Sequence, residues 1–499
     1  MWAASPRPLS SEEMAVVEQN AVALGVSLDN LMESAGRAIA EEATRRLPPP
    51  PSRVAVVAST GNNGGDGTCC AHYLHQWGFS PEVWIVRPVA EIRSRAARRC
   101  FERIERTVPV HLRVPRPEEL ATMPLVIDAL LGTGQFVPIR GPVLEAVEAI
   151  RKSAAPVLSI DLPTGALDPN GLRPTTTVAL TVAKREMNLE TAGEIVVRDI
   201  GIPLEAWRRT GPGEFAFFPV PATRSGKGRT ARLIVIGGGP YAGAPALAAL
   251  AALRSGVERA TVLAPRGAAE KVQGFSPTLV VRAFGADRFR PTDVPEILEF
   301  VRGARPDAVA VGMGAGADPE TLEALGAIER NLVGSVPLLV DADGLAALPS
   351  PTEIRAKGGT ALVATPNPGE FGRLFADATA LTPANRAETV GRLARERHLF
   401  LVAKGDPDVL SDGEMTVENH HHHPAMTVAG VGDVLGGVLA GLLGQGLGPL
   451  AAARLATYWV GEAGIVAASR RSFGLIATDV VEELPTALSA GIARSRRGE

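Results

Sequence analysis

Two hydrophobic patterns alternate along this chain. Short apolar runs rich in β-branched residues are separated by longer segments in which apolar residues recur every three or four positions. The first pattern predicts buried parallel strands, and the second predicts the helices that cover them. In the N-terminal half the predicted strands are "RVAVVAS", "EVWIVRP", "PLVIDALLG", "APVLSIDLP" and "TVALTVA". The pattern therefore predicts an α/β fold built on a parallel sheet.

The alternation stops once and then begins again. The stretch "FAFFPVPATRSGKG", Phe215–Gly228, is rich in proline and glycine, which is typical of a domain boundary. Strand-like runs then resume as "RLIVIGGG", "ATVLAP", "AVAVGMG", "PLLVDADG", "TALVATP" and "LFLVAKG". We therefore expect two domains, residues 1–218 and 222–499, each with its own parallel sheet.

Composition narrows the class of protein. Of 499 residues, 45% are hydrophobic and 21% are charged, and the net charge of -3 argues against a nucleic-acid surface or a polybasic membrane patch. The uncharged runs Leu233–Leu253 and Val434–Ala453 are interrupted by glycines and by Pro449, so they are predicted to be buried core and not membrane spans. The N-terminus resembles no secretory signal, and three cysteines form no disulfide framework. We expect a cytoplasmic enzyme that binds neither nucleic acid nor membrane.

Polar side chains follow three predicted strands of the N-terminal half. "GNNGGDG", Gly61–Gly67, follows the first strand as a predicted turn before a helix, and Asp128 and Asp161 end two later strands. The carboxyl ends of parallel strands meet at one crevice, and backbone N–H groups at a helix start favour an anion. One aspartate at a strand exit is more often a helix cap. Three such exits together favour a site for a cation or a polar ligand.

"MESAGRAIA", "GNNGGDG", "DALLGTG" and "IDLPTG", in this order, resemble the NAD(P)H-hydrate epimerase family, which has a Rossmann-like three-layer fold. The resemblance covers roughly residues 10–215 and implies interconversion of R and S hydrates at one nicotinamide carbon, with Asp161 as the acid–base group. The residues it implies at the damaged dinucleotide are Asn62, Asn63, Gly64, Gly65, Asp66, Gly132, Thr133, Gly134, Gln135, Phe136, Val137, Pro138 and Asp161. It also implies a potassium ion held by Asn63, Asp128 and Thr164.

In the C-terminal half the sharpest motif is "AGVGDVLGGVLAGLLGQG", Ala429–Gly446. Its glycines precede Asp433 and a long apolar helix, so backbone N–H groups could bind an anion while Asp433 acts as a base. The alternative interpretation is a glycine-rich turn in which Asp433 only caps the helix.

This motif and its companions "GMGAG", "VDADGL", "TPNPGEFGRLF" and "VAKGDPDVL" resemble the ADP-dependent NAD(P)H-hydrate dehydratases, members of the ribokinase-like superfamily, over about residues 222–490. The resemblance implies that Asp433 deprotonates the hydroxyl of the S hydrate, which attacks the terminal phosphate of ADP. Mg²⁺ is the expected ion of this domain. The implied hydrate-site residues are Ala244, Gly316, Asn367 and Asp433, and the implied nucleotide-site residues are Lys404, Gly405, Asp406, Pro407, Asp408 and Gly432. Asn367 stands where many members carry histidine and cannot titrate, so we expect no catalytic role for it.

The leading hypothesis is a homo-oligomeric bifunctional enzyme that repairs NADHX and NADPHX. One alternative is a ribokinase-like small-molecule kinase with a regulatory N-terminal domain, and another makes that domain a non-catalytic scaffold. The presence of Asn63, Asp128 and Asp161 argues against the scaffold. The run His420–His423 is interpreted as a solvated loop, and Cys69–Cys70 as core or half-core residues of a helix.

Overall fold

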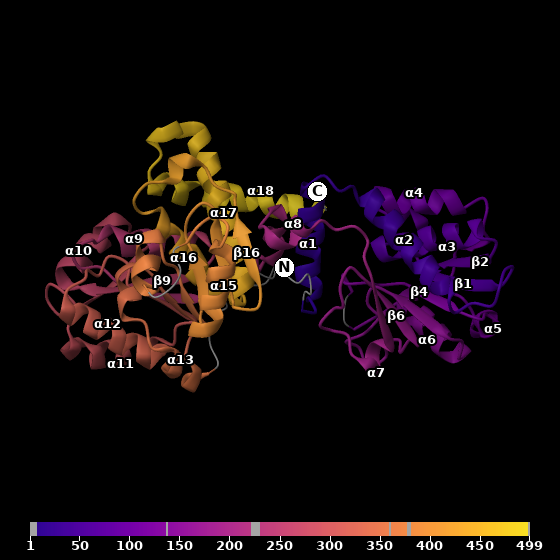
Figure 1. The fold of residues 1–499 in the computed structure, drawn as a ribbon, viewed down its shortest axis with the longest axis horizontal. Coiled ribbons are helices and arrows are strands. Elements are labelled where there is room, and N and C mark those ends of the chain that lie inside the picture. The colour runs from indigo at the N-terminus through magenta and orange to yellow at the C-terminus, as the bar shows by residue number, and fades with distance from the viewer. Residues whose placement is uncertain (1–6, 136–137, 221–229, 359–360, 377–380, 498–499) are drawn as a thin grey trace. The chain divides into compact units, whose positions relative to one another are not determined.

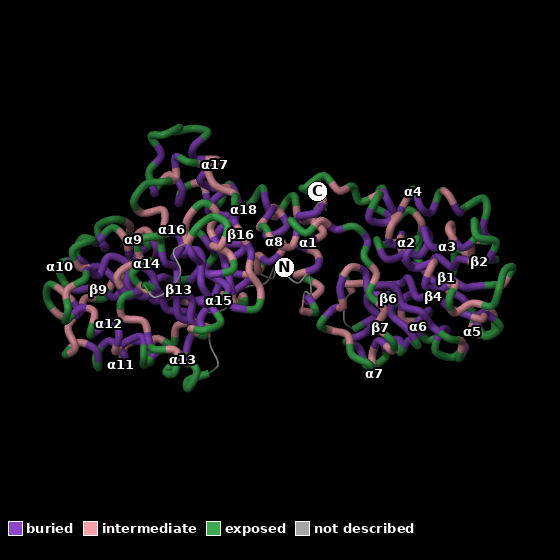
Figure 2. Tube along the Cα trace, in the orientation of Figure 1, coloured by how far each residue is buried: buried purple, intermediate pink, exposed green. Residues whose placement is uncertain are grey.

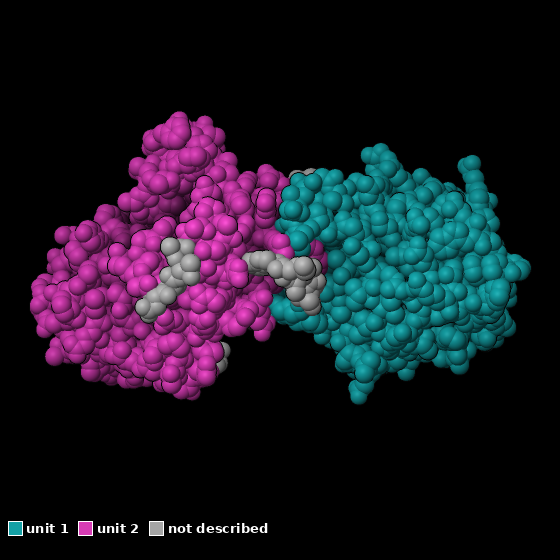
Figure 3. Space-filling model, viewed as in Figure 1, with its two compact units in different colours: residues 1–206 teal, residues 207–499 magenta. Residues whose placement is uncertain are grey.

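The chain divides into two compact units, Met1–Ala206 and Trp207–Glu499 (Figure 3). The fold is that of a computed structural model, which describes residues 7–135, 138–220, 230–358, 361–376 and 381–497. The sequence suggested that the domains separate within the Pro- and Gly-rich stretch at residues 215–228. The structure instead places residues 207–220 in the C-terminal unit.

The N-terminal unit is built on a seven-stranded sheet in which every pair of strands is parallel. The strands lie in the order β3-β2-β1-β4-β5-β6-β7. Their bounds are β1 Arg53–Ala58, β2 Ser80–Ile85, β3 Val110–His111, β4 Val126–Ala129, β5 Val157–Ile160, β6 Thr176–Leu180 and β7 Glu194–Arg198. This is the order of a Rossmann-like sheet, so the predicted fold class is confirmed. The order reverses between β1 and β4, whose carboxyl ends therefore flank the crevice where such sheets bind ligands.

Helices cover both faces of this sheet. Helices α2, α3 and α4 pack against one another on one face, and α5 and α6 pack on the other (Figure 1). The helices are α1 Ser11–Ala23, α2 Leu28–Thr44, α3 Asn62–Gln76, α4 Arg95–Ile104, α5 Pro117–Ala121, α6 Pro142–Ser153, α7 Leu189–Ala192 and α8 Leu204–Arg208. The central strands are consequently buried on both sides (Figure 2), which explains why they read as continuous apolar runs.

The predicted turn "GNNGGDG" is in fact the beginning of α3. Gly61 is the N-cap, and the helix starts at Asn62. A Cβ on Gly64 would lie 1.9 Å from the carbonyl oxygen of Ser59, and one on Gly67 would lie 2.4 Å from the Cβ of Ala129. The expectation that these glycines form a turn outside the helix is therefore wrong. They allow α3 to approach the sheet more closely than a side chain would permit.

The C-terminal unit contains a nine-stranded sheet in the order β10-β9-β8-β11-β12-β13-β14-β15-β16. Strands β8 to β14 pair in parallel, while β15 and β16 are antiparallel. Their bounds are β8 Arg232–Ile236, β9 Arg259–Pro265, β10 Val280–Phe284, β11 Ala308–Val311, β12 Leu338–Val340, β13 Leu362–Ala364, β14 Phe400–Ala403, β15 Asp408–Ser411 and β16 Thr416–Asn419. The α/β class predicted for this half is confirmed.

Two groups of helices enclose this second sheet (Figure 1). Helices α9, α16, α17 and α18 pack together on one face, and α11 to α15 contribute to the core on the other. Their bounds are α9 Gly243–Arg254, α10 Arg266–Phe275, α11 Val294–Ala304, α12 Pro319–Leu332, α13 Pro351–Lys357, α14 Pro368–Leu374, α15 Arg386–Arg397, α16 Val431–Gly444, α17 Pro449–Arg471 and α18 Ala477–Arg497. Within the described ranges, no helix is both long enough and apolar enough to cross a membrane.

The segment 207–220 is anchored in the C-terminal unit by a buried ion pair and by aromatic contacts. Glu214 and Arg454 are both buried, and the guanidinium donates two hydrogen bonds to the carboxylate, of 3.0 Å and 2.8 Å. The ring of Phe215 meets that of Trp459 edge to face, with centroids 6.5 Å apart. Because a buried charge that loses its partner is costly, this unit needs the segment for its own stability.

Candidate functional sites

Asp128, on β4, is the most completely enclosed carboxylate of the N-terminal crevice. It is fully buried and accepts hydrogen bonds from Thr164 N (3.0 Å), Thr164 Oγ1 (2.7 Å), Ser159 Oγ (2.8 Å) and Leu130 N (3.2 Å). Burial raises the pKa of Asp128, and these hydrogen bonds oppose that rise. The structure thus brings together two of the three residues expected to hold a cation, and all of the hydrogen-bond donors around the carboxylate are uncharged.

Asn63, the third of those residues, lies in the first turn of α3 and is buried. A Cβ on Gly132 would lie 3.0 Å from Asn63 Oδ1, so the amide lies against the loop that follows β4. Within the part of the chain that the structure describes, the Nδ2 of Asn63 has no hydrogen-bond partner. A buried N–H donor without a partner is rare in proteins, and the Nδ2 of Asn63 can be satisfied only by a hydrogen-bond acceptor.

The loop after β4 is tied to the loop after β5. Gly165 N donates to Gln135 Oε1 at 2.7 Å, and Gln135 Nε2 donates to Pro163 O at 3.4 Å. The predicted contact segment Gly132–Gln135 therefore borders the crevice, with Pro138 exposed beyond it. Phe136 and Val137, also predicted contacts, lie outside the described residues.

Asp161 follows β5 with a left-handed backbone (φ 63°) and lies against a buried lysine. The Nζ of Lys184 donates to Asp161 Oδ1 and, at 2.9 Å, to Leu180 O. The lysine side chain is 0% exposed, so this ion pair is shielded from water. The side chain expected to perform acid–base chemistry therefore has a cation as its direct partner.

Two further carboxyl groups lie near this pair, Asp66 on α3 and Glu18 on α1. Burial and the charge of Asp161 raise the pKa of Glu18 to about 7, while Lys184 opposes the rise. Burial and Asp161 also raise the pKa of Asp66 well above its usual range. Burial among like charges thus favours the protonated forms of Glu18 and Asp66.

In the C-terminal unit, three adjacent parallel strands deliver polar residues to one edge of the sheet. Asp341 follows β12, Asn367 lies just after β13, and Lys404 follows β14. The N-terminus of α16 meets them, and together they border a cavity of about 810 Å³. The predicted residues in its lining are Asn367, Lys404, Gly405, Asp406, Asp408, Gly432 and Asp433. Pro407, Ala244 and Gly316 are not in the lining.

Charge in this cavity is arranged around Asp433, in the first turn of α16. Lys404 Nζ donates to Asp341 Oδ1 at 2.8 Å, and a Cβ on Gly432 would lie 3.3 Å from the same Nζ. Burial, with a further contribution from the carboxylate of Asp341, raises the pKa of Asp433 to about 7, and Lys404 opposes this rise. Although a helix N-terminus favours an ionised carboxylate, burial and the neighbouring acids outweigh it here.

Two predicted residues are occupied by structural hydrogen bonds. Asp408 accepts from Gly405 N at 2.8 Å and from Asn419 Nδ2 at 3.1 Å, which holds the loop after β14. Asn367 Oδ1 accepts from Glu370 N at 2.9 Å and caps α14. Both side chains also line the cavity.

Comparison with known proteins extends over both units. Residues 233–486 match the NAD(P)H-hydrate dehydratase family, and residues 28–186 match the family described as YjeF-related protein N-terminus. The Bifunctional NAD(P)H-hydrate repair enzyme Nnr of Hyperthermus butylicus is 35% identical, over 98% of this chain and 94% of that protein. The enzyme of the same name from Pyrobaculum aerophilum is 37% identical, over 96% of this chain and 97% of that protein. The chain belongs to the family of bifunctional NAD(P)H-hydrate repair enzymes.

Among solved structures, the ADP/ATP-dependent NAD(P)H-hydrate dehydratase from Bacillus subtilis co-crystallized with ATP/Mg2+ is 22% identical, with a TM-score of 0.48, over 56% of this chain and 97% of that one.

In this repair enzyme the histidine run is an irregular, partly exposed segment, as the sequence predicted, and it also forms part of the cavity wall. His421, His422 and His423 line the 810 Å³ cavity. The ring of His421 stacks on Tyr458 with centroids 4.2 Å apart, and its Nε2 lies 2.7 Å from Glu462 Oε2. Four identical residues in a row carry no signal of which ring faces inward.

Sequence reasoning missed several charged residues of these sites. Lys184 follows β6 and Glu18 lies on α1, and neither belongs to a recognisable motif. Asp341 lies in the motif "VDADGL" at the end of a predicted strand. An aspartate in this position is also the signal that singled out Asp128 and Asp161. The pairing of Asp341 with Lys404, however, joins positions 63 residues apart.

Proposed function

We propose that this enzyme repairs the hydrates of NADH and NADPH in two steps. The N-terminal unit interconverts the R and S epimers, and the C-terminal unit converts the S epimer to the reduced cofactor with ADP as co-substrate. Membership of the family supports both activities. The observation that best supports the chemistry is the carboxyl of Asp433, whose pKa of about 7 suits a base at the start of α16.

In the dehydration step, Asp433 accepts the proton of the hydrate's ring hydroxyl. The hydroxyl oxygen forms a bond to the terminal phosphorus of ADP, and the bond between that phosphorus and AMP breaks. Phosphate then leaves with the electrons of the ring C–O bond, and the neighbouring ring carbon loses a proton, which restores the dihydronicotinamide. Phosphorylation is needed because hydroxide is a poor leaving group, whereas phosphate is a good one.

Residues near Asp433 supply charge for the nucleotide. Lys404 is cationic and lies against Gly432, and the first N–H groups of α16 point out of the helix at this place. The carboxylates of Asp341 and Asp433 are oxygen donors suited to a Mg²⁺ ion bound with the phosphates. Such an ion would neutralise charge on the transferred phosphoryl group.

In the epimerisation step, Asp161 and Lys184 provide a proton acceptor and a proton donor in contact with each other. Inverting a carbon that carries a hydroxyl requires that protons be removed and returned, which a positioned acid–base pair accelerates. Glu18 and Asp66 are placed to exchange protons with this pair, because their pKa values are raised by burial and by Asp161.

The residues of the N-terminal crevice fit a potassium ion. Asn63, Asp128 and Thr164 offer amide, carboxylate and hydroxyl oxygens, which suit a hard cation. The fit rests on the buried Asp128 carboxylate, whose donors are uncharged, and on the Oδ1 of Asn63, which lies against the loop after β4. A cation there would supply the positive charge that a pyrophosphate requires.

The cation site can be tested by replacing its carboxylate. Asp128→Ala should abolish epimerisation and leave dehydration of the S hydrate unchanged, because the two sites belong to separate units. Epimerisation rates measured in potassium and in a non-binding organic cation should differ for the wild type. An equal loss of both activities in the variant would indicate misfolding, and the experiment would then contradict a specific role of Asp128 in a cation site.

The function as a whole can be tested with a mixture of R and S hydrates, supplied with and without ADP. With ADP, absorbance of the reduced cofactor should rise until both epimers are consumed, and AMP and free phosphate should appear in equal amounts. A stable phosphorylated product without reduced cofactor would instead support a small-molecule kinase.

A further inference from the structure

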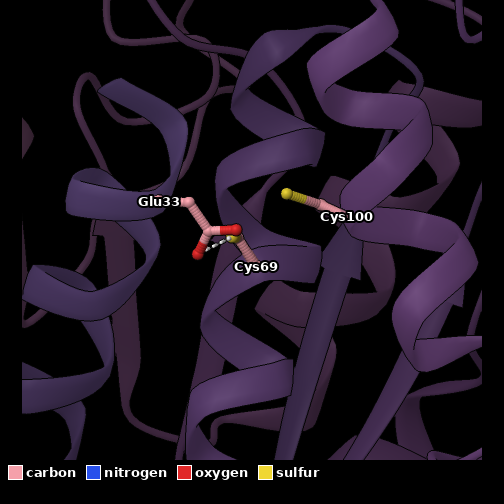
Figure 4. Close-up of side chains that lie close together, drawn as sticks. All are labelled: Glu33, Cys69 and Cys100. Carbon is pink, nitrogen blue, oxygen red and sulfur yellow. Dashed lines mark hydrogen bonds between the residues drawn. The ribbon is translucent and has the colours of Figure 1, made fainter. Parts of the chain in front are cut away.

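A second polar group lies in the N-terminal unit among helices α2, α3 and α4. It consists of Glu33 on α2, Cys69 on α3 and Cys100 on α4 (Figure 4). The two sulfur atoms and a carboxylate oxygen of Glu33 lie within 4.8 Å of one another. Figure 4 shows the sulfur of Cys100 directed from its helix toward the other two side chains. The group is unusual because α3 and α4 bring two cysteines together without a disulfide.

Arg103 supplies a positive charge to both sulfurs. Its NH2 nitrogen lies 3.0 Å from Cys69 Sγ and 3.7 Å from Cys100 Sγ, and its NH1 nitrogen pairs with Glu33 at 2.6 Å. Tyr73 donates to the other oxygen of Glu33 at 2.8 Å. The guanidinium of Arg103 therefore already contacts all three side chains of the group. Positive charge next to a thiol favours the thiolate, which is the reactive form.

The two thiols differ in their surroundings. The Cys69 thiol lowers the pKa of Cys100, and Arg103 lowers it further. Cys100, together with burial, raises the pKa of Cys69, which donates a hydrogen bond toward Glu33. Both cysteines are buried, Cys69 at 0% and Cys100 at 4% exposed, but Cys100 lines a cavity of about 370 Å³ together with Glu33 and Arg103. A small molecule in this cavity therefore meets Cys100 first.

We propose that Cys69 and Cys100 form an oxidisable dithiol in which Cys100 reacts with hydrogen peroxide or another small peroxide. The Cys100 thiolate attacks one peroxide oxygen, so an S–O bond forms, the O–O bond breaks, and hydroxide leaves. Sulfur is oxidised to the sulfenic acid by two electrons. The Cys69 sulfur then attacks the Cys100 sulfur, forming the S–S bond and releasing the sulfenic oxygen, which becomes water with the Cys69 proton. In total, two thiols and one peroxide give one disulfide and two water molecules.

Formation of the disulfide requires movement. A disulfide bond is about 2.0 Å long, so the two sulfurs, which lie within 4.8 Å of each other, must approach. Helix α4 packs closely against the motif "GNNGGDG". A Cβ on Gly65 would lie 2.7 Å from the Cβ of Ala97, one turn before Cys100, so a movement of Cys100 takes place next to this motif.

The test uses the full-length protein, reduced and then exposed to hydrogen peroxide at a small molar excess. After the remaining thiols are blocked with N-ethylmaleimide, mass spectrometry should find the loss of two hydrogen atoms, a Cys69–Cys100 cross-linked peptide, and full reversal by dithiothreitol. Cys69→Ser should stop the reaction at a sulfenic acid on Cys100, which dimedone traps. Cys100→Ser should remove the reaction.

Cys70 provides the matched control. It is the chain neighbour of Cys69 and is equally buried, but burial raises its pKa and no arginine contacts its sulfur among the described residues. Cys70→Ser should oxidise like the wild type. Arg103→Gln should slow the reaction of Cys100 about tenfold, because less of it is ionised.

Two results would overturn the proposal. One is a peroxide reaction at Cys70 that is as fast as at Cys100. The other is stoichiometric, chelator-resistant binding of Zn²⁺ by the reduced protein that is lost in both Cys69→Ser and Cys100→Ser, since the group would then be a metal site.

Discussion

In the N-terminal unit Asp161 touches the buried ammonium of Lys184, whereas in the C-terminal unit the nearest lysine, Lys404, pairs with Asp341 and leaves Asp433 without an ion pair among the described residues. Both aspartates lie near the carboxyl ends of parallel strands. The difference lies in where the cation is. Asp161 therefore has a charged hydrogen-bond partner in its own site, whereas burial and the neighbouring acids raise the pKa of Asp433 to about 7. The same architecture thus places a carboxyl group in two different electrostatic environments.

The largest expected effect is at Asp433. Asp433→Asn keeps the size of the side chain and its capping ability but removes the base, so dehydration should fall about 10²–10⁴-fold while ADP still binds. Turnover and ADP affinity should be measured separately, with Asp161→Asn as the control that retains dehydration. Near-normal turnover in the Asp433 variant would mean that Asp433 only caps the helix. The comparison between Asp161 and Asp433 as acid–base groups would then be wrong.

The second effect concerns the buried cation of the other site. Lys184→Met should lower epimerisation about 10²-fold, because the donor is lost and Asp161 no longer has its partner. Losing one member of a buried pair also costs about 3–5 kcal/mol of stability. Asp161→Asn combined with Lys184→Met should recover stability in chemical denaturation but not activity. Lys152→Met, on the exposed face of α6, is the neutral control. If the double variant regains activity, the pair has only a structural role.

The third prediction tests the independence of the units. A fragment of residues 207–499 should be folded and should dehydrate the S hydrate. One that begins at residue 224 lacks Glu214 and Phe215 and should be several kcal/mol less stable, because Arg454 is left buried and unpaired. Urea unfolding of both fragments measures the difference. Equal stability would mean that this ion pair is not needed for the fold.

The smallest effect is a pH dependence specific to the C-terminal site. The pKa of Asp433 is raised to about 7, and the base must be ionised, so dehydration should fall about tenfold per unit below pH 7 and level off above it. Since the raised pKa means that the folded unit favours the protonated form, its stability should decrease as pH rises from about 4 through about 7. Asp433→Asn should remove the trend in activity and weaken the trend in stability, to which the buried carboxyls of Glu329 and Asp408 also contribute. An acidic limb that persists in the Asn variant would assign the titration to another group.

Motifs within one stretch of chain could be interpreted from the sequence. The glycines of "GNNGGDG", Asp128 and the "GVGD" turn each mark a strand exit or a helix start, and periodicity places those ends. In the structure Thr164 donates two hydrogen bonds to Asp128. Such contact is expected for two motifs that follow neighbouring parallel strands. The sequence did not show that the glycines of "GNNGGDG" belong to α3. Their function is to let α3 approach Ser59 and Ala129 closely, and this depends on packing and not on local propensity.

The sequence by itself determined that this is an α/β protein with two sheets made mainly of parallel strands, and it predicted which strand ends carry chemistry. Only the tertiary structure decided which charges meet. Lys184 reaches Asp161, Lys404 reaches Asp341, Glu214 reaches Arg454 and Cys69 reaches Cys100 across 23, 63, 240 and 31 positions of the chain, a spacing that no periodic pattern specifies. Hydrophobic periodicity depends on neighbouring residues, whereas burial and ion pairing depend on how the sheets and helices pack. Burial is also the largest cause of the raised pKa values of Glu18, Asp66 and Asp433.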